Sequence, residues 1–216
     1  MPSATERPKQ ERGQARRALL VEAASELFLE RGYEATSLDE IIARAGGSRR
    51  NVYEWFGGKE ALFAAVVENG CAQILESLIV PDFANVEPRP ALVSIGQRFM
   101  KALTEPRMLG LYRVIVAEGG RFPELGRAIF NFGPKQGYER LAANLRAWDD
   151  QGRISVRDPD MAARLMLEMM KGDMHMRLLF EPENQPDANE INYQVELAVD
   201  IILHGIAKTG GETPTR

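Results

Sequence analysis

The sequence predicts an all-α fold, with a helix-turn-helix near the N-terminus and a larger helical domain behind it. Apolar residues recur at intervals of three and four along most of the 216-residue chain, as on one face of a helix. Strand-like alternation is nearly absent, and short segments containing glycine or proline separate the periodic stretches. We therefore expect about nine or ten helices.

The first two helices are bounded by recognisable end signals. Leu27 and Phe28 belong to the apolar face of a helix expected at about 11–31, which Arg31-Gly32 ends with a basic residue and a glycine. Ser37 and Glu40 form a Ser-x-x-Glu capping box, which satisfies the free amide groups of a helix start. A short second helix is expected at about 38–45.

A third short helix follows a glycine turn. Gly46 and Gly47 break the second helix, Ser48 can cap the next one, and Gly57-Gly58 ends it. Two short helices joined by such a turn are spaced as in a helix-turn-helix, whose second helix can lie in a DNA major groove about 12 Å wide.

The rest of the chain reads as further helices. A connecting helix is expected at 59–79. Beyond the loop that contains Pro81 to Pro90, the spacing predicts helices at about 90–104, 107–119, 123–132, 134–151, 158–180 and 188–208. We expect a disordered basic arm at 1–10, a DNA-binding domain at 11–58, a ligand-binding and dimerisation domain at 80–208, and a disordered tail at 209–216.

Composition excludes several classes of protein. The hydrophobic share of 44% and the charged share of 27% are those of a globular domain, and no apolar run approaches the roughly 20 residues that span a bilayer. Met1 to Gln10 lacks the apolar core of a secretion signal, so a cytoplasmic location without membrane partners is expected. With two histidines, one cysteine and no phosphate-loop or metal-ligand pattern, we expect no enzyme, no catalytic residue, no cofactor and no metal site.

Charge is distributed unevenly along the chain. The net charge of −4 argues against binding nucleic acid through bulk electrostatics. Residues 1–17, however, carry five basic against two acidic side chains, and residues 44–59 carry four against one. The second patch includes the proposed recognition segment from Ser48 to Phe56, which opens with a hydroxyl, two guanidinium groups and a carboxamide. Arginine can pair with guanine and asparagine with adenine through two hydrogen bonds each.

The stretch from Gly32 to Leu62 resembles the DNA-binding region of TetR-type transcriptional regulators. The shared features are a Thr-Ser pair before the second helix, Ala-Gly and Ser in the turn, Tyr-x-x-Phe in the third helix and Lys-Glu-x-Leu at the start of the fourth. The resemblance covers residues 11–68 closely. A weaker likeness, in Arg113 to Leu125, is to a C-terminal subgroup of these regulators.

The resemblance implies roles for individual residues. Thr36 and Ser37 would contact phosphate, as hydroxyls and helix N-termini do. Arg49, Arg50 and Asn51 would face base edges, whereas Tyr53, Trp55 and Lys59 would contact or lie near the sugar-phosphate backbone. Ser48, at the start of the third helix, is also expected in the DNA-binding site.

Some of these assignments have structural alternatives, and the chain departs from the family at two positions. Tyr53 and Trp55 are alternatively core residues, and Lys59 is alternatively an exposed residue at a helix start, although a cation there opposes the helix dipole. The family usually has valine where this chain has Gly47, and often glycine where it has Arg50. The first departure puts the stiffness of the turn in doubt, and the second leaves the operator sequence unpredicted.

The C-terminal domain contains more apolar side chains than a thin helical bundle needs, which favours a ligand pocket. Six of the nine methionines lie between 161 and 176, and methionine adapts its shape to irregular ligands. Glu118 either pairs with Arg121 or another basic residue, or holds a polar group of the ligand. Plain core packing is the alternative for each candidate pocket residue. The candidates are Phe99, Met100, Leu103, Leu111, Ile115, Glu118, Phe130, Tyr138, Trp148, Met166 and Met170.

The last two predicted helices, 158–180 and 188–208, are expected to form a homodimer interface. The residues that share a face are Ala162, Leu165, Met166, Met169, Gly172 and Asp173 on the first helix, and Val195, Ala198, Val199, Ile202, Gly205 and Ile206 on the second. Two such pairs make a four-helix bundle across a twofold axis. A twofold dimer presents two recognition helices about 34 Å apart and therefore predicts a palindromic operator in double-stranded DNA.

The sequence thus predicts a ligand-responsive, DNA-binding transcriptional regulator. The interpretation favoured is a homodimeric repressor that a small apolar or amphipathic effector releases from its operator. An activator of the same fold, and a helical small-molecule carrier without DNA binding, remain the alternatives.

Overall fold

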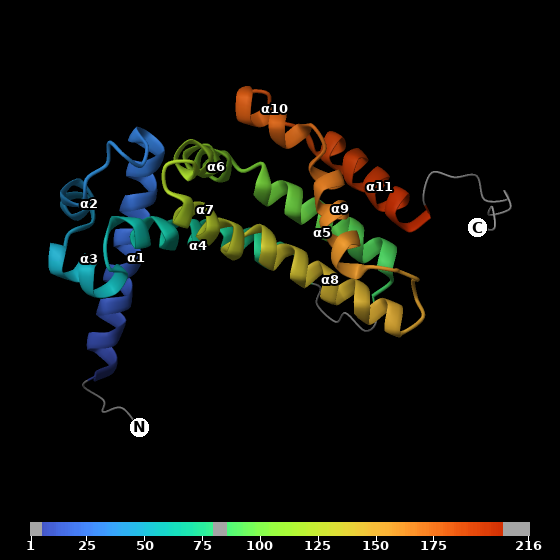
Figure 1. Cartoon of the computed structure of the whole chain (residues 1–216), viewed down its shortest axis with the longest axis horizontal. Coiled ribbons are helices and arrows are strands. Elements are labelled where there is room, and N and C mark those ends of the chain that lie inside the picture. The colour runs from blue at the N-terminus through green and yellow to red at the C-terminus, as the bar shows by residue number, and fades with distance from the viewer. Residues whose placement is uncertain (1–5, 80–85, 205–216) are drawn as a thin grey trace, which may run out of the picture. The chain divides into compact units, whose positions relative to one another are not determined.

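A computed structural model describes residues 6–79 and 86–204, and all the regular structure within these ranges is helical. The helices, labelled in Figure 1, are α1 (Glu6–Arg31), α2 (Leu38–Ala45), α3 (Arg49–Phe56), α4 (Lys59–Ser77), α5 (Pro88–Leu103), α6 (Pro106–Gly119), α7 (Pro123–Phe132), α8 (Pro134–Asp150), α9 (Pro159–Lys171), α10 (Met174–Phe180) and α11 (Ala188–His204). The predicted all-α fold is confirmed.

The helix starts follow from local chemistry. Helices α5 to α9 each begin at a proline, whose missing N–H has no intrahelical partner at that position and whose φ angle already suits a helix. Most predicted boundaries agree with the observed ones to within two residues. Helix α1 is an exception, because it begins at Glu6 inside the expected disordered arm. Residues 1–5 and the expected tail at 209–216 lie outside the described residues.

The chain forms two compact units, and they do not follow the expected linear division. Unit 1 comprises residues 1–76 and 102–136, and unit 2 comprises residues 77–101 and 137–216. Helices α6 and α7 therefore pack with the N-terminal helices rather than with the rest of the C-terminal half. Sequence periodicity does not reveal this arrangement, because it shows that a face is apolar without showing what covers it.

Unit 1 is built on a core shared by α1, α4 and the region around α6. Phe28 and Phe63 meet edge to face with ring centroids 5.2 Å apart, and Tyr33 contacts both rings. Helix α6 approaches α1 closely at Gly110, where a Cβ atom would lie 2.8 Å from Cδ2 of Leu29. Val52 and Ile41 are fully buried and attach the two short helices to this core.

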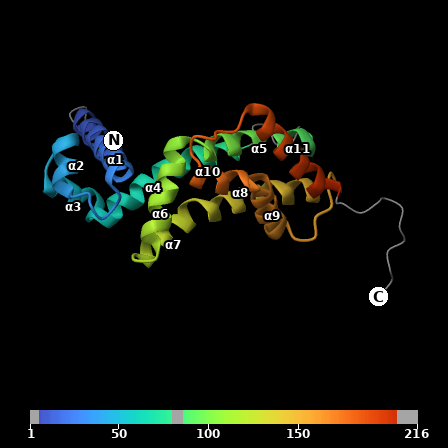
Figure 2. The same cartoon turned by 90° about the horizontal axis from the view of Figure 1, so that it is seen from above.

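Unit 2 has its own core, in which Trp148 is the largest fully buried side chain. Helices α5 and α11 come close at Gly96, since a Cβ atom there would lie 2.5 Å from Cγ1 of Val195. Arg89 of α5 donates to both carboxylate oxygens of Asp200 on α11, at 2.9 and 3.2 Å. Figure 2 shows α5 and α11 side by side.

Several side chains expected at the dimer interface belong instead to the core of unit 2. Met166, Val195, Ala198 and Val199 are all buried within the single chain. The part of the apolar face of α11 formed by Val195, Ala198 and Val199 is therefore used inside the protomer. Leu165, also expected at the interface, is 52% exposed on α9.

The helix predicted at 158–180 is interrupted at Gly172, which separates α9 from α10 and adds one helix to the ten expected segments. Gly172 has φ 49° and ψ −138°, a conformation that residues with a Cβ rarely adopt. A Cβ at this position would also collide with the side-chain amide of Gln194 on α11. The backbone angle therefore favours glycine, and a larger residue would also displace the side-chain amide of Gln194.

Replacing Gly172 with alanine is expected to destabilise the protein by about 1–3 kcal/mol, because the backbone angle is strained for alanine and Gln194 must move. Urea unfolding at fixed protein concentration measures this. Gly13→Ala is the matched control, since Gly13 lies within α1 and a Cβ atom added there would meet no heavy atom within 4 Å. That variant should stabilise the protein slightly, because alanine is the better helix former. If G172A were as stable as the wild type, the backbone at position 172 would not be strained for alanine.

Candidate nucleic-acid interface

The turn between α2 and α3 depends on two successive glycines. Gly46 has φ 73° and donates its N–H to the carbonyl of Ile42 at 2.8 Å, which closes α2. Gly47 follows with φ 121°, where a side chain would be strained. The glycine at position 47 is therefore part of the geometry of the turn.

Both helices of the motif have the predicted N-terminal caps. The Ser37 hydroxyl accepts from the N–H of Glu40, whose carboxylate in turn accepts from the N–H of Ser37 at 2.8 Å, so the capping box is complete. The Ser48 hydroxyl accepts from the N–H of Asn51 at 3.2 Å and donates to its side-chain oxygen at 2.8 Å. These bonds hold Ser48 and Asn51 together at the start of α3.

Helix α3 has one buried and one exposed side. Val52 is fully buried, and Trp55 is half-buried against the core of unit 1. Arg49, Arg50 and Tyr53 are exposed, with Tyr53 at 57%. The exposure of Tyr53 excludes its alternative role as a core residue, and the helix presents cationic and aromatic side chains to solvent.

The two arginines that begin α3 each meet a carboxylate. Arg49 donates to both oxygens of Asp39 on α2, with Nε 2.7 Å from Oδ1, and Arg50 donates through Nε to Glu54 one turn later at 2.6 Å. Hydrogen bonding by Arg49 lowers the pKa of Asp39 below its ordinary value. The partner Asp39 could not be found from the sequence, because its ten-residue separation from Arg49 crosses a turn of unknown geometry.

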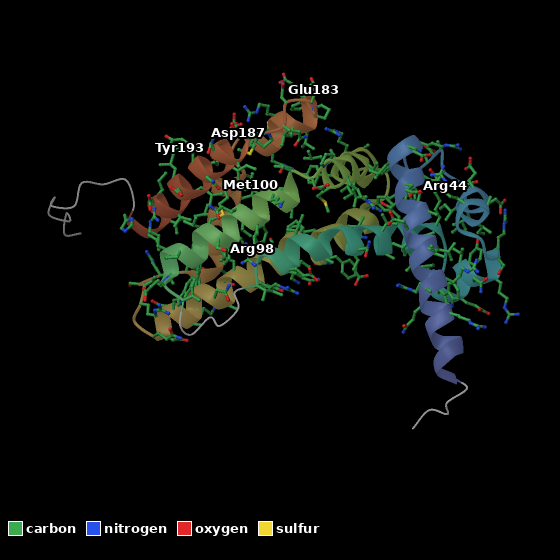
Figure 3. The ribbon with its side chains drawn as sticks, turned by 180° about the vertical axis from the view of Figure 1, so that it is seen from behind. Arg44, Arg98, Met100, Glu183, Asp187 and Tyr193 are labelled. Atoms are coloured by element: carbon green, nitrogen blue, oxygen red, sulfur yellow. The ribbon has the colours of Figure 1, made fainter. Side chains whose placement is uncertain are left out.

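Arg44 is used to hold the motif together. It donates from Nη1 and Nη2 to the two carboxylate oxygens of Glu30 on α1, at 2.7 and 3.0 Å, and contacts Glu26 as well. Arg31 at the end of α1 pairs with Glu40 of α2. Figure 3 shows Arg44 at the α1–α2 side of the unit. Part of the basic patch therefore orients α2 on α1 rather than adding to the exposed positive surface.

Lys59 lies at the start of α4 and is half-buried against the α1–α2 loop. Its ammonium nitrogen is 4.4 Å from the ring centroid of Tyr33 and donates to the carbonyl of Glu34 at 3.3 Å. Burial lowers the pKa of Lys59. The Glu34 carboxylate is paired in turn with Arg121, which follows α6. Contact with an aromatic face thus accounts for a cation at a helix start.

The expectation for Thr36 needs correction. Its side chain is buried, with 1% of its surface exposed, and its hydroxyl donates to the carbonyls of Leu27 and Gly32 at 3.1 and 2.8 Å. Thr36 therefore caps the end of α1 and does not offer its hydroxyl to a phosphate. Ser37 is exposed beside it, although its hydroxyl serves the capping box.

The candidate ligand residues are divided between the two units. Leu103, Leu111, Ile115, Glu118 and Phe130 belong to unit 1, whereas Phe99, Met100, Tyr138, Trp148, Met166 and Met170 belong to unit 2. Leu111 is part of the unit 1 core, and Met100, Met166 and Met170 are fully buried in unit 2. The Tyr138 hydroxyl donates to Glu168 at 2.9 Å. A pocket lined by these residues stays a prediction.

Glu118 lies near cationic groups. Burial lowers the pKa of Lys59, and the charge of Glu118 opposes that shift. Hydrogen bonding to Glu34 raises the pKa of Arg121, and Glu118 adds to this shift through its charge. The backbone carbonyl of Glu118 accepts from the N–H of Arg121 at 2.9 Å. The buried Oε2 atom of Glu118 has no hydrogen-bond partner within the described part of the chain. Both alternatives for Glu118, a structural ion pair and a contact with a polar group of the ligand, stay predictions.

The described residues also lack the features of two other kinds of site. Within residues 6–79 and 86–204, no three His, Cys, Asp or Glu side chains are grouped so that they could hold a metal ion. None of the helices described there combines the length and the apolar character that crossing a membrane requires.

Comparison with known families covers most of the chain. Residues 20–66 match the model for bacterial regulatory proteins of the tetR family, and residues 90–205 match the model for the C-terminal domain of AefR-like transcriptional repressors. The first match contains the whole helix-turn-helix, and the second spans α5 to α11 apart from the first two residues of α5.

Individual relatives and solved structures agree with these models. The chain is 27% identical over 192 residues to the uncharacterized HTH-type transcriptional regulator YezE of Bacillus subtilis, covering 86% of this chain and 95% of that protein. A TetR-family regulator from Mesorhizobium loti superposes with a TM-score of 0.80 and 27% identity, over 89% of this chain and 96% of that one. The flavonoid-responsive regulator FrrA superposes with a TM-score of 0.75 and 29% identity, over 88% of this chain and 96% of that one. This chain is a member of the TetR family of helix-turn-helix transcriptional regulators.

Proposed function

We propose that the protein is a homodimeric repressor that binds a palindromic operator in double-stranded DNA and is released by a small apolar or amphipathic effector. The observation that carries the proposal is the exposed side of α3, where Arg49, Arg50 and Tyr53 face solvent while Val52 anchors the helix. A short helix with cationic side chains at its N-terminal end suits the major groove, where arginine pairs with guanine.

Repression rather than activation is supported by the family model matched by residues 90–205, which describes AefR-like repressors. An activator of the same fold would share the DNA interface. A small-molecule carrier without DNA binding would share only the helical fold, and the exposed cations of α3 would then have no use.

The proposed effector class is supported by a relative and by the composition of unit 2. FrrA is described as flavonoid-responsive. Unit 2 of this chain has a core rich in methionine, with Met100, Met166 and Met170 fully buried. Methionine side chains rearrange at low cost and can make room for a planar apolar molecule.

The dimer is supported by exposed apolar side chains on α9, α10 and α11. Soluble proteins rarely leave such a group of large apolar residues uncovered. Figure 3 shows Tyr193 projecting from α11. These exposed residues are Met161, Leu165, Met176, Phe180, Tyr193 and Leu197.

DNA binding can be tested by isolating genomic fragments bound by the protein and measuring affinity against salt. The logarithm of the binding constant should fall linearly with the logarithm of salt concentration. Lys59→Ala should weaken binding to all sequences alike and reduce the slope by about one phosphate contact. Lys135→Ala, which removes an exposed lysine of α8, is the charge-matched control. An unchanged salt slope for K59A would show that Lys59 only packs on Tyr33. If the wild-type protein bound no DNA fragment, the alternative of a small-molecule carrier would be favoured.

Adding the true effector should weaken operator affinity by about 5- to 150-fold, the usual range for coupled sites. Flavonoids are a first set of probes, and fluorescence anisotropy of labelled operator DNA measures the release. A compound that binds the protein and leaves operator affinity unchanged is no effector. An increase in affinity on binding would favour an activator.

Leu165→Asp should convert the dimer to a monomer, because a carboxylate would be buried at the centre of the proposed interface. Leu19→Asp is the matched control, since Leu19 is 53% exposed on α1 and Leu165 is 52% exposed on α9. Sedimentation velocity separates the two states. If L165D remained dimeric, or if L19D dissociated equally, the interface would lie elsewhere.

A further inference from the structure

The pair formed by Asp39 and Arg49 connects the two helices of the motif at their N-terminal ends. Asp39 is the second residue of α2, and Arg49 is the first residue of α3. Nε of Arg49 lies 2.7 Å from Oδ1 of Asp39, and Nη2 lies 2.5 Å from Oδ2. The two side chains are 65% and 63% exposed, so the pair lies at the surface that the proposed function assigns to DNA.

A guanidinium group has five N–H donors arranged along its edges. Asp39 occupies the edge formed by Nε and Nη2 of Arg49. These two parallel hydrogen bonds form a fork between Arg49 and Asp39. They do not use the outer edge of the guanidinium group, which is formed by Nη1 and the second hydrogen of Nη2. Two parallel donors along that edge match O6 and N7 of a guanine, and holding the opposite edge in place limits the rotation of the guanidinium plane.

Asp39 lies in the first turn of α2, where a negative charge is favourable with the helix dipole, but its carboxylate is not part of the hydrogen-bonded cap. The N–H of Glu40 is accepted by Ser37, and the N–H of Ser37 is accepted by Glu40, so the cap of α2 is complete without Asp39. The turn that follows contains two glycines at positive φ, which do not restrain a side chain in α3. The fork is therefore a direct restraint on where Arg49 points.

Resting on the proposed DNA binding, we propose that Asp39 is a positioning residue for base recognition, which holds the outer edge of Arg49 toward a guanine in the major groove. Arg50 differs in this respect. Its contact with Glu54 is a single bond from Nε within the same helix, and its side chain is 85% exposed. Of the two arginines, Arg49 is therefore the one whose guanidinium group is held in a fixed orientation by a neighbouring helix.

The positioning role of Asp39 can be measured because its negative charge also affects DNA affinity. Asp39 is an anion on a surface that approaches phosphates, so its charge weakens binding to every DNA sequence. Removing the charge should therefore strengthen binding to non-specific DNA and weaken discrimination at one base pair. A residue that only stabilised α2 would not change these two quantities in opposite directions.

The experiment uses the full-length protein and an operator selected from random DNA. Arg49→Ala first identifies the base pair that Arg49 reads, where preference for guanine should fall by about 5- to 150-fold, the range for one such contact. Affinities of Asp39→Asn are then measured for the four base pairs at that position and for non-specific DNA at one salt concentration. Discrimination should fall at least about fivefold, and non-specific affinity should rise.

Two further variants separate the alternatives. Glu54→Gln removes one carboxylate from the same surface and should raise non-specific affinity while leaving discrimination at the Arg49 base pair unchanged. Arg49→Lys keeps the charge but cannot form the fork. It should lose discrimination without a change in non-specific affinity, and it tests the proposal even if D39N fails to fold.

The proposal is overturned if D39N discriminates as well as the wild type, or if R49A and R49K keep the preference for guanine. Tighter binding of D39N to all sequences alike would show that Asp39 acts only through its charge. These outcomes all require that the wild type selects a DNA sequence. A wild-type protein that selects none contradicts the proposed function itself.

Discussion

The packing of four aromatic rings supports the arrangement of unit 1. Phe28 of α1, Tyr33 of the following loop and Phe63 of α4 contact one another with ring centroids 5.0 to 5.5 Å apart, and Phe122 after α6 contacts Tyr33 at 5.2 Å. Rings at such distances and tilts attract one another beyond the burial of their area. Because the rings come from separate elements, this one cluster holds α1, α4 and the α6–α7 region together.

The short helices depend on that cluster and its surroundings. A helix of eight residues is not stable alone in water, so α2 and α3 need tertiary contacts. Ile41 and Val52 provide them by burying one side of each helix. Lys59 adds a link, since it rests on the face of Tyr33 at the end of the motif.

Charge has two uses in the motif. Acidic residues of α1 hold Arg44, and the acidic residue Glu40 holds Arg31, so several carboxylates serve to place α2. The arginines of α3 are also paired, Arg49 with Asp39 and Arg50 with Glu54, but both remain largely exposed to solvent. A chain with a net charge of −4 therefore still presents guanidinium groups at the start of α3.

Much of the candidate interface could be predicted from local patterns. Ser37, Ser48 and the glycines around them act over a few residues, and the structure shows the predicted caps and turn. The phosphate contact that the family resemblance implied for Thr36 is wrong, because its hydroxyl bonds carbonyls at the end of the preceding helix. A Thr-Ser pair before a helix is compatible with a threonine that contacts phosphate and with one that caps the preceding helix. Only the packing around Tyr33 and Leu27 decides between these two roles.

The sequence by itself determined the helices, their caps, and the family to which the motif belongs, because these depend on residues within one or two turns of each other. Tertiary structure decided which long-range partners meet: Asp39 with Arg49, Lys59 with Tyr33, and α6 with α1. It also placed the apolar face of α11 inside the protomer. Periodicity identifies an apolar face, but what covers it depends on the path of the whole chain.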